Sequence, residues 1–311
     1  MRTRGLKLQF IMFLLALVVF PIPGRAQMQN IAEKLGYPAN SKLLIIHGDD
    51  LAVAHSVDVA TFRALDEKAI SSASIMMTCP WVTEVAAYAK AHPDADLGLH
   101  LTLTSEWETY KWGPVAPKDL VPGLLDADGY LYPDNASVTK HATAEEVERE
   151  IRAQVELALK MGIHPTHLDM HMGTAAARPD YYAALVKVAH EYKLPFLAVR
   201  AHALSDTALS MLSDKDIVLD SVVIFGPQVS PGEWTSTYVK RLAELKPGVH
   251  YLIVHLGYDD SELQAVTVNH PDYGAAWRER DFHAVMSPEF KKALEDNHII
   301  VIGWKDLKKL L

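Results

Sequence analysis

Eight short apolar segments alternate with stretches of helical periodicity, and this alternation constrains the fold more than any other feature of the chain. Short strands that alternate with helices indicate a parallel sheet with helical crossovers. Eight strands favour closure into a barrel over an open sheet, so we predict a single-domain α/β barrel. The predicted strands lie at 42–47, 72–77, 97–103, 166–170, 196–200, 217–225, 249–256 and 299–303. Helices are predicted at 52–68, 82–91, 143–161, 181–192, 206–216, 235–245 and 288–297.

The first 26 residues have the layout of a secretory signal peptide. Arg2, Arg4 and Lys7 precede an apolar run at 10–20, and small residues lead to a cleavage site near Ala26. The apolar run is shorter than a membrane span requires; an uncleaved amino-terminal anchor is the alternative. We therefore expect an exported protein, periplasmic or secreted, without stable membrane insertion once the signal is removed. The mature domain would cover 27–311.

Composition excludes several classes of function. The chain has 39 acidic and 30 basic residues, and the predicted signal contains four of the basic ones and no acid. A mature chain this acidic, without a basic cluster, is a poor nucleic-acid binder. No glycine-rich dinucleotide fingerprint or phosphate loop follows a predicted strand, which argues against a nucleotide cofactor. Cys79 is the single cysteine, so no internal disulfide can form. Association into a homo-oligomer is left open.

A long segment at about 104–142 breaks the alternation. It is rich in Pro, Gly and Asp, and a loop of this length inside a compact domain usually has a function. Its aromatic side chains could be platforms for sugar rings, or they could fill a small core of their own. These residues are Trp107, Tyr110, Trp112, Tyr130 and Tyr132.

Histidines and aspartates gather at the ends of four predicted strands, where chemistry is located in such barrels. One reading is that each histidine is a hydrogen-bonded core residue. The other is that the fold gathers them around a divalent ion such as zinc, which imidazole and carboxylate ligands suit. Spacing alone does not decide between these readings, because no close pair such as His-x-x-x-His occurs. The residues are His47, Asp49 and Asp50; His100; His167, Asp169 and His171; and His255.

Three segments resemble motifs of the YdjC-like, or ChbG/HpnK-type, carbohydrate deacetylases. The family pattern Asn-Ala-Asp-Asp-Phe-Gly is similar to HGDDLA at 47–52, and Gly-Leu-His-Leu-x-Leu-Thr matches GLHLTLT at 98–104. Pro-x-His-Leu-Asp-Ser-His resembles PTHLDMH at 165–171. Weaker likenesses follow, of His-Pro-Gly-Tyr to HLGY at 255–258 and of Arg-x-x-Glu-Leu to RERDF at 278–282. The matches run in order over about 43–306.

The resemblance implies a fold, a reaction and a set of roles. The fold is an irregular (β/α)-barrel of the glycoside hydrolase/deacetylase kind, and the reaction removes an acetyl group from an N-acetylated sugar. One divalent metal ion, zinc or magnesium, would be held by Asp50, His100 and His171. Asp49 would be the general base, and His255 would stabilise the oxyanion or protonate the leaving amine.

Five other residues are candidates for support of the site or for substrate binding. They are Asp169, His167, Arg278, Trp107 and Tyr258. Asp169 could orient a ligand imidazole, and Arg278 could pair with an acid or bind substrate.

The sequence also departs from the family pattern. His47 and Gly48 replace Asn-Ala, Leu256 replaces a usual proline, and Gly173 stands where many members have a further histidine. These changes leave the proposed ligands in place and alter the wall of the pocket. Two alternatives to a deacetylase are therefore kept: a metal-dependent hydrolase of another ester or phosphate bond, and a non-catalytic glycan-binding barrel.

Overall fold

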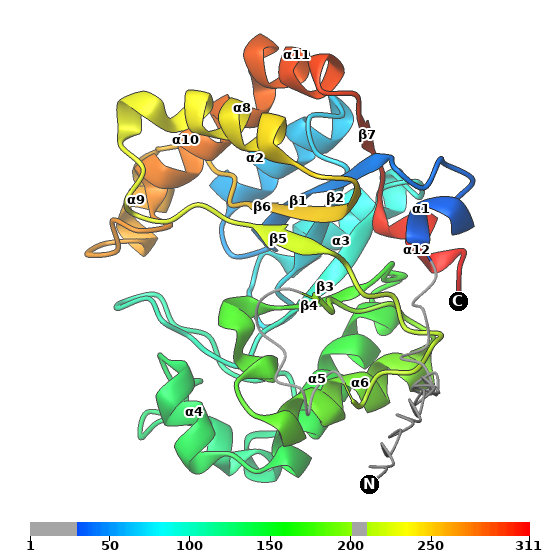
Figure 1. Cartoon of the computed structure of the whole chain (residues 1–311). Helices are drawn as coiled ribbons and strands as arrows, with labels where there is room; N and C mark the ends of the chain where they lie inside the picture. The colour runs from blue at the N-terminus through cyan, green and yellow to red at the C-terminus, as the bar shows by residue number, and fades with distance from the viewer. Residues whose placement is uncertain (1–29, 201–209) are drawn as a thin grey trace, which may run out of the picture.

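The computed structural model describes residues 30–200 and 210–311 (Figure 1). The predicted signal peptide at 1–26 lies outside these ranges, so export stays a prediction. No helix in the described part of the chain is both long enough and apolar enough to span a membrane.

One parallel sheet of seven strands forms the centre of the molecule. The order is β4-β3-β2-β1-β6-β5, with β7 paired to the beginning of β1. The strands are β1 (Lys42–Leu51), β2 (Ser72–Ile75), β3 (Leu97–Leu101), β4 (Leu168–Met170), β5 (Ser221–Val223), β6 (Gly248–Val254) and β7 (Ile299–Val301). Seven of the eight predicted strands are therefore present, each with shifted ends.

The eighth predicted strand, at 196–200, forms only single bridges, and this makes the barrel irregular. Phe196 bridges Leu168 of β4, and Val199 bridges Leu219, which precedes β5. Both bridges are parallel. The segment 195–200 therefore spans the gap between the two outer strands of the curled sheet. The expected α/β barrel is confirmed in this irregular form.

Helices cover the sheet on the outside (Figure 1). Helices α2 (His55–Asp66), α8 (Trp234–Glu244), α10 (Ala275–Met286) and α11 (Pro288–Asp296) gather on one side, and α5 (Ala144–Lys160) packs with α6 (Pro179–Tyr192) on another. α3 is Val82–Ala91, as predicted. Short helices complete the described part: α1 (Ile31–Lys34), α4 (Asn135–His141), α9 (Ser261–Val266), α12 (Trp304–Lys308) and the 3-10 turns Lys118–Leu120, Pro122–Leu124, His171–Ala176 and Pro231–Glu233.

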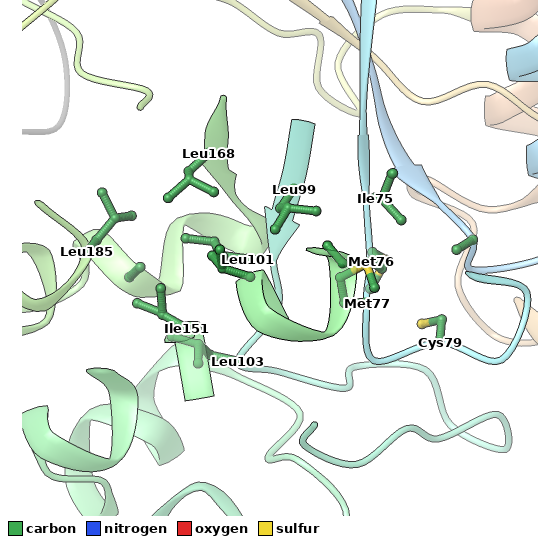
Figure 2. Packing of buried hydrophobic residues seen from close by; sticks show 14 of the residues in the cluster. Ile75, Met76, Met77, Cys79, Leu99, Leu101, Leu103, Ile151, Leu168 and Leu185 are labelled. Carbon is green, nitrogen blue, oxygen red and sulfur yellow. The ribbon is translucent and has the colours of Figure 1, made fainter. Parts of the chain in front are cut away.

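The core between β3 and helices α5 and α6 is formed by alternate apolar residues of the strand. Leu99 and Leu101 of β3 face Ile151 of α5 and Leu185 of α6, and all four side chains are fully buried (Figure 2). α5 begins at a capping box, in which the Thr143 hydroxyl accepts from the Glu146 amide and the Glu146 carboxylate accepts from the Thr143 amide.

Three parts of the predicted element pattern are wrong. The segment 104–142 is not wholly irregular, because α4 and two 3-10 turns form within it. The sequence pattern does not predict helices α1, α9, α10 and α12. Of the helix predicted at 206–216, residues 210–216 form turns, and the remainder lies outside the described residues.

Candidate active site

The carboxyl end of β1 places two adjacent carboxylates in one cleft. In a regular strand, Asp49 and Asp50 would point to opposite faces. β1 continues to Leu51, past its predicted end, and its register with β2 shifts between Gly48 and Leu51. Asp50 has a positive φ of 66° there. This bulge allows both side chains to line a cleft of about 730 Å³. Backbone strain of this kind is commonly concentrated at functional sites.

Asp50, His100 and His171 converge on one point. Asp50 Oδ1 lies 3.2 Å from His100 Nε2 and 3.2 Å from His171 Nδ1. Atoms that bind one ion at about 2.0–2.2 Å lie about 3.0–3.5 Å apart, which these distances fit. Asp50 Oδ1 is buried and accepts no hydrogen bond from any described residue. The unpaired oxygen and the two facing nitrogens are a donor set suited to a divalent ion.

Each of the two imidazoles is fixed from behind by a carboxylate. His100 Nδ1 donates to Asp169 Oδ1 at 2.8 Å, and His171 Nε2 donates to Glu106 Oε2 at 2.9 Å. Each ring therefore turns its other nitrogen toward Asp50. Histidines that bind metals in proteins nearly always have such a partner on the second nitrogen. This arrangement is harder to explain for histidines that only fill a core.

A buried polar network holds Asp169 in turn. Its Oδ2 accepts from the Tyr251 hydroxyl at 2.9 Å and lies 2.9 Å from His47 Nε2. The other ring nitrogen of His47 is 2.6 Å from the Ser72 hydroxyl. All four side chains are buried inside the barrel, so Asp169 has little freedom to rotate.

His171 lies in a tight turn that is fastened to the long 104–142 segment. The two residues after it, Met172 and Gly173, have positive φ angles of 51° and 66°. Asn135, at the beginning of α4, donates to the Met172 carbonyl at 2.9 Å and accepts from the Thr174 hydroxyl at 2.6 Å. The segment thus holds the turn through Asn135 and holds the ring through Glu106.

Arg278 of α10 neutralises the second oxygen of Asp50. Its Nη2 donates to Asp50 Oδ2 at 2.6 Å, its Nε donates to the Tyr273 carbonyl, and the side chain is only 1% exposed. Burial disfavours the charged form of Asp50, but the Arg278 guanidinium and the adjacent imidazoles of His100 and His171 hold its pKa well below the usual range. Asp50 is therefore an anion at neutral pH.

Asp49 occupies a different electrostatic environment. Burial, together with the neighbouring charges of Asp169 and Asp50, raises its pKa to about 7. Its Oδ2 lies 3.8 Å from both His100 Nε2 and His255 Nε2. Two adjacent carboxylates with opposite pKa shifts can serve as a fixed ligand and as a proton acceptor, respectively.

His255 follows β6 and faces the two carboxylates from the other side. Its Nε2 lies 3.8 Å from Asp49 Oδ2 and 4.0 Å from Asp50 Oδ2. Burial, with the nearby positive charge of Arg278, lowers the pKa of His255 to about 3. The ring is therefore neutral at pH 7.

The remaining predicted residues are spread around this centre. Trp107 lines the cleft, with the Arg278 guanidinium 5.6 Å from its ring centre, and is 3% exposed. His167 lies behind Asp169, stacked on Trp304 at 4.7 Å. Tyr258 does not line the cleft and packs against Phe282.

Residues that sequence reasoning missed also contribute to the site. Glu106, Tyr251 and Asn135 fix the ligands or their partners, and none lies in a motif of the resemblance. Of the aromatic residues in the 104–142 segment, Trp107 and Trp112 are buried with ring centres 5.6 Å apart. These two form a small core more than an open sugar platform.

The sequence of the chain matches the model of one protein family, described as YdjC-like protein, over residues 43–296. That range covers most of the chain and includes every residue of the site described above. The chain belongs to the YdjC-like family. The resemblance noted in the sequence is therefore confirmed.

YdjC-like relatives extend along the same length. A carbohydrate deacetylase of Thermus thermophilus is 30% identical over 297 residues, with 91% of this chain and 99% of the relative covered. A carbohydrate deacetylase of Thermoanaerobacter pseudethanolicus is 24% identical, with 86% and 100% covered. A crystal structure from Enterococcus faecalis, named for a proposed role in cellobiose-phosphate cleavage, superposes with a TM-score of 0.73 at 24% identity, with 86% of this chain and 99% of that chain covered. This likeness confirms the fold.

Proposed function

We propose that the protein is a metal-dependent carbohydrate deacetylase that removes an acetyl group from an N-acetylated sugar or oligosaccharide. The proposal rests on one observation: ring nitrogens of His100 and His171 converge on the unpaired Oδ1 atom of Asp50. The names of the full-length relatives support the choice of an acetylated sugar as substrate.

Asp50, His100 and His171 would hold one divalent ion, zinc or magnesium. Such an ion, when bound, polarises an amide carbonyl and lowers the pKa of an attacking water. Arg278 keeps Asp50 anionic and correctly turned, because it binds the oxygen that faces away from the imidazoles. Asp169 and Glu106 fix the two rings and increase their basicity.

Asp49 would act as the general base. Its carboxylate is beside the ligands without being bound by Arg278, so it is free to accept the proton of the attacking water. A positive ion nearby would favour its ionised form. The proton accepted by Asp49 would pass to the leaving amine, and His255 would donate a hydrogen bond to the oxyanion, a role that suits a neutral ring.

The test uses the purified protein and a panel of substrates of three kinds: N-acetylated sugars, O-acetyl esters and phosphate monoesters. Acetate and phosphate release are measured before and after chelation, and again after zinc or magnesium is restored. We expect acetate from the N-acetylated sugars only while metal is present. Phosphate release as the main activity would favour the other hydrolase class, and sugar binding without turnover would favour a glycan-binding barrel.

An Asp49→Asn variant tests the assignment of the base. Base catalysis typically contributes about 10²–10⁴-fold, so kcat should fall by that factor while bound metal is retained. Asp94→Asn, on an exposed turn before β3, removes a carboxylate remote from the cleft and is the matched control. Full turnover by Asp49→Asn would exclude this residue as the base.

A further inference from the structure

The cleft beside the candidate ligands extends well beyond the space that an acetyl group requires. At about 730 Å³ it falls in the range of pockets that enclose whole small-molecule ligands. The wall of the cleft away from the candidate ligands is lined by apolar side chains and is called the carbon wall below. It consists of Met170, Leu197, Val199, Val222, Ile224 and Ile253.

The cleft is lined by four carboxylates and by four imidazoles, those of His100, His171, His255 and His270. The carboxylates of Asp49, Glu106 and Asp272 face it in addition to Asp50. Among the described lining residues, Arg278 is the one lysine or arginine, and its guanidinium is buried against Asp50. The sequence of 201–209 contains neither lysine nor arginine.

We propose that the cleft selects neutral N-acetylated sugars and discriminates against those that carry a phosphate or a carboxylate. The inference rests on the deacetylase function proposed above and specifies its substrate class. An anionic substituent that lies on the carbon wall, away from the candidate ligands, would lose its hydration without gaining a positively charged partner, because the described lining arginine, Arg278, is already bound to Asp50. Burial of an unpaired charge is strongly unfavourable. A neutral sugar would place its apolar C–H faces on the carbon wall and its hydroxyls near the carboxylates, which accept hydrogen bonds.

The first experiment compares kcat/KM for N-acetylglucosamine and diacetylchitobiose with kcat/KM for their 6-phosphates. All four sugars are assayed at the same pH and ionic strength. We expect the neutral sugars to be preferred at least tenfold. Equal or better turnover of the phosphorylated sugars would overturn the inference and leave the deacetylase function standing. If none of the four sugars released acetate, the proposed deacetylase function itself would be refuted.

A second experiment places a positive charge on the carbon wall. Ile224 lines the cleft and is 47% exposed, so a lysine at this position can keep its ammonium group in water. Ile224→Lys should reduce the preference for the neutral sugar severalfold, and the reduction should weaken as salt is raised. Ile224→Gln, of similar length without charge, is the matched control and should retain the wild-type preference. The same ratio in the lysine variant as in the glutamine control would contradict the electrostatic origin of the selectivity.

Discussion

Asp169→Asn tests whether the carboxylate that accepts a hydrogen bond from His100 strengthens metal binding at the proposed site. Asparagine has nearly the same shape, and its side-chain oxygen can still accept from His100 Nδ1 in place of Asp169 Oδ1. The amide nitrogen would take the place of Oδ2, opposite the Tyr251 hydroxyl and His47 Nε2, which can both act as acceptors. The fold should therefore survive while the negative charge beside the ligand ring is lost.

Loss of such an orienting carboxylate typically lowers metal affinity about 10–100-fold. This range corresponds to about 1.4–2.7 kcal/mol of binding free energy. Tyr251→Phe removes one of the hydrogen bonds to Asp169 and keeps its charge. We therefore expect a smaller loss of affinity in Tyr251→Phe than in Asp169→Asn.

The assay is titration of the metal-free protein with zinc, in competition with a chelator of known affinity, and circular dichroism monitors the fold. A zinc affinity for Asp169→Asn within twofold of the wild type, in a folded protein, would refute the role of Asp169 behind a ligand. A greater loss in Tyr251→Phe than in Asp169→Asn would show that the hydrogen bond that orients Asp169, not its charge, dominates.

Four further substitutions have measurable outcomes. His100→Ala and His171→Ala should each lose bound metal, and unchanged stoichiometry by elemental analysis would exclude them as ligands. Burial raises the pKa of Glu150 from 4.5 to about 7, so its proton is held more tightly in the folded chain than in the unfolded one. The contribution of Glu150 to stability is therefore greatest below pH 4.5 and falls as the pH rises to 7. Glu150→Gln has a constant loss, because its amide nitrogen cannot accept from one of the Val115 and Ala116 amides. Urea unfolding should nevertheless show its free energy of unfolding rising by up to about 3 kcal/mol relative to the wild type between pH 4.5 and 7, and a pH-independent difference would contradict this. Gly98→Ala would place a Cβ 2.3 Å from the buried His167 ring, and we expect a loss of about 1–3 kcal/mol in the free energy of unfolding; a variant as stable as the wild type would show that the ring can move.

Sequence patterns predicted the elements whose signals are local. The 82–91 helix matches α3 at both ends, and the Thr143 capping pattern correctly marked the beginning of α5. α10 was missed because it buries charged as well as apolar side chains, among them Arg278 and Asp281, so its sequence lacks a clear apolar stripe. α4 was missed because its neighbours are Pro, Gly and Asp, although Asp134 caps it in a recognisable way.

Sequence patterns likewise predicted some residues of the candidate site and not others. The residues at strand ends were found because parallel strands bring their carboxyl ends together. The partners that fix them were not, because Glu106 and His171 are 65 positions apart and only the folded chain brings them into contact. The orientation of Asp50 likewise depends on a bulge that neither propensity nor period signals.

The link between Asn135 and the Met172 turn has a consequence for engineering new specificity in this family. The 104–142 stretch looks like an exchangeable lid, and a designer would be tempted to graft the equivalent stretch of a relative onto this scaffold. Such a chimera would also replace Glu106 and Asn135, whose hydrogen bonds hold His171 and its turn in place. Transplants that preserve Glu106 and Asn135 should keep the proposed metal site, whereas those that discard them should lose it before any change in substrate preference can be observed.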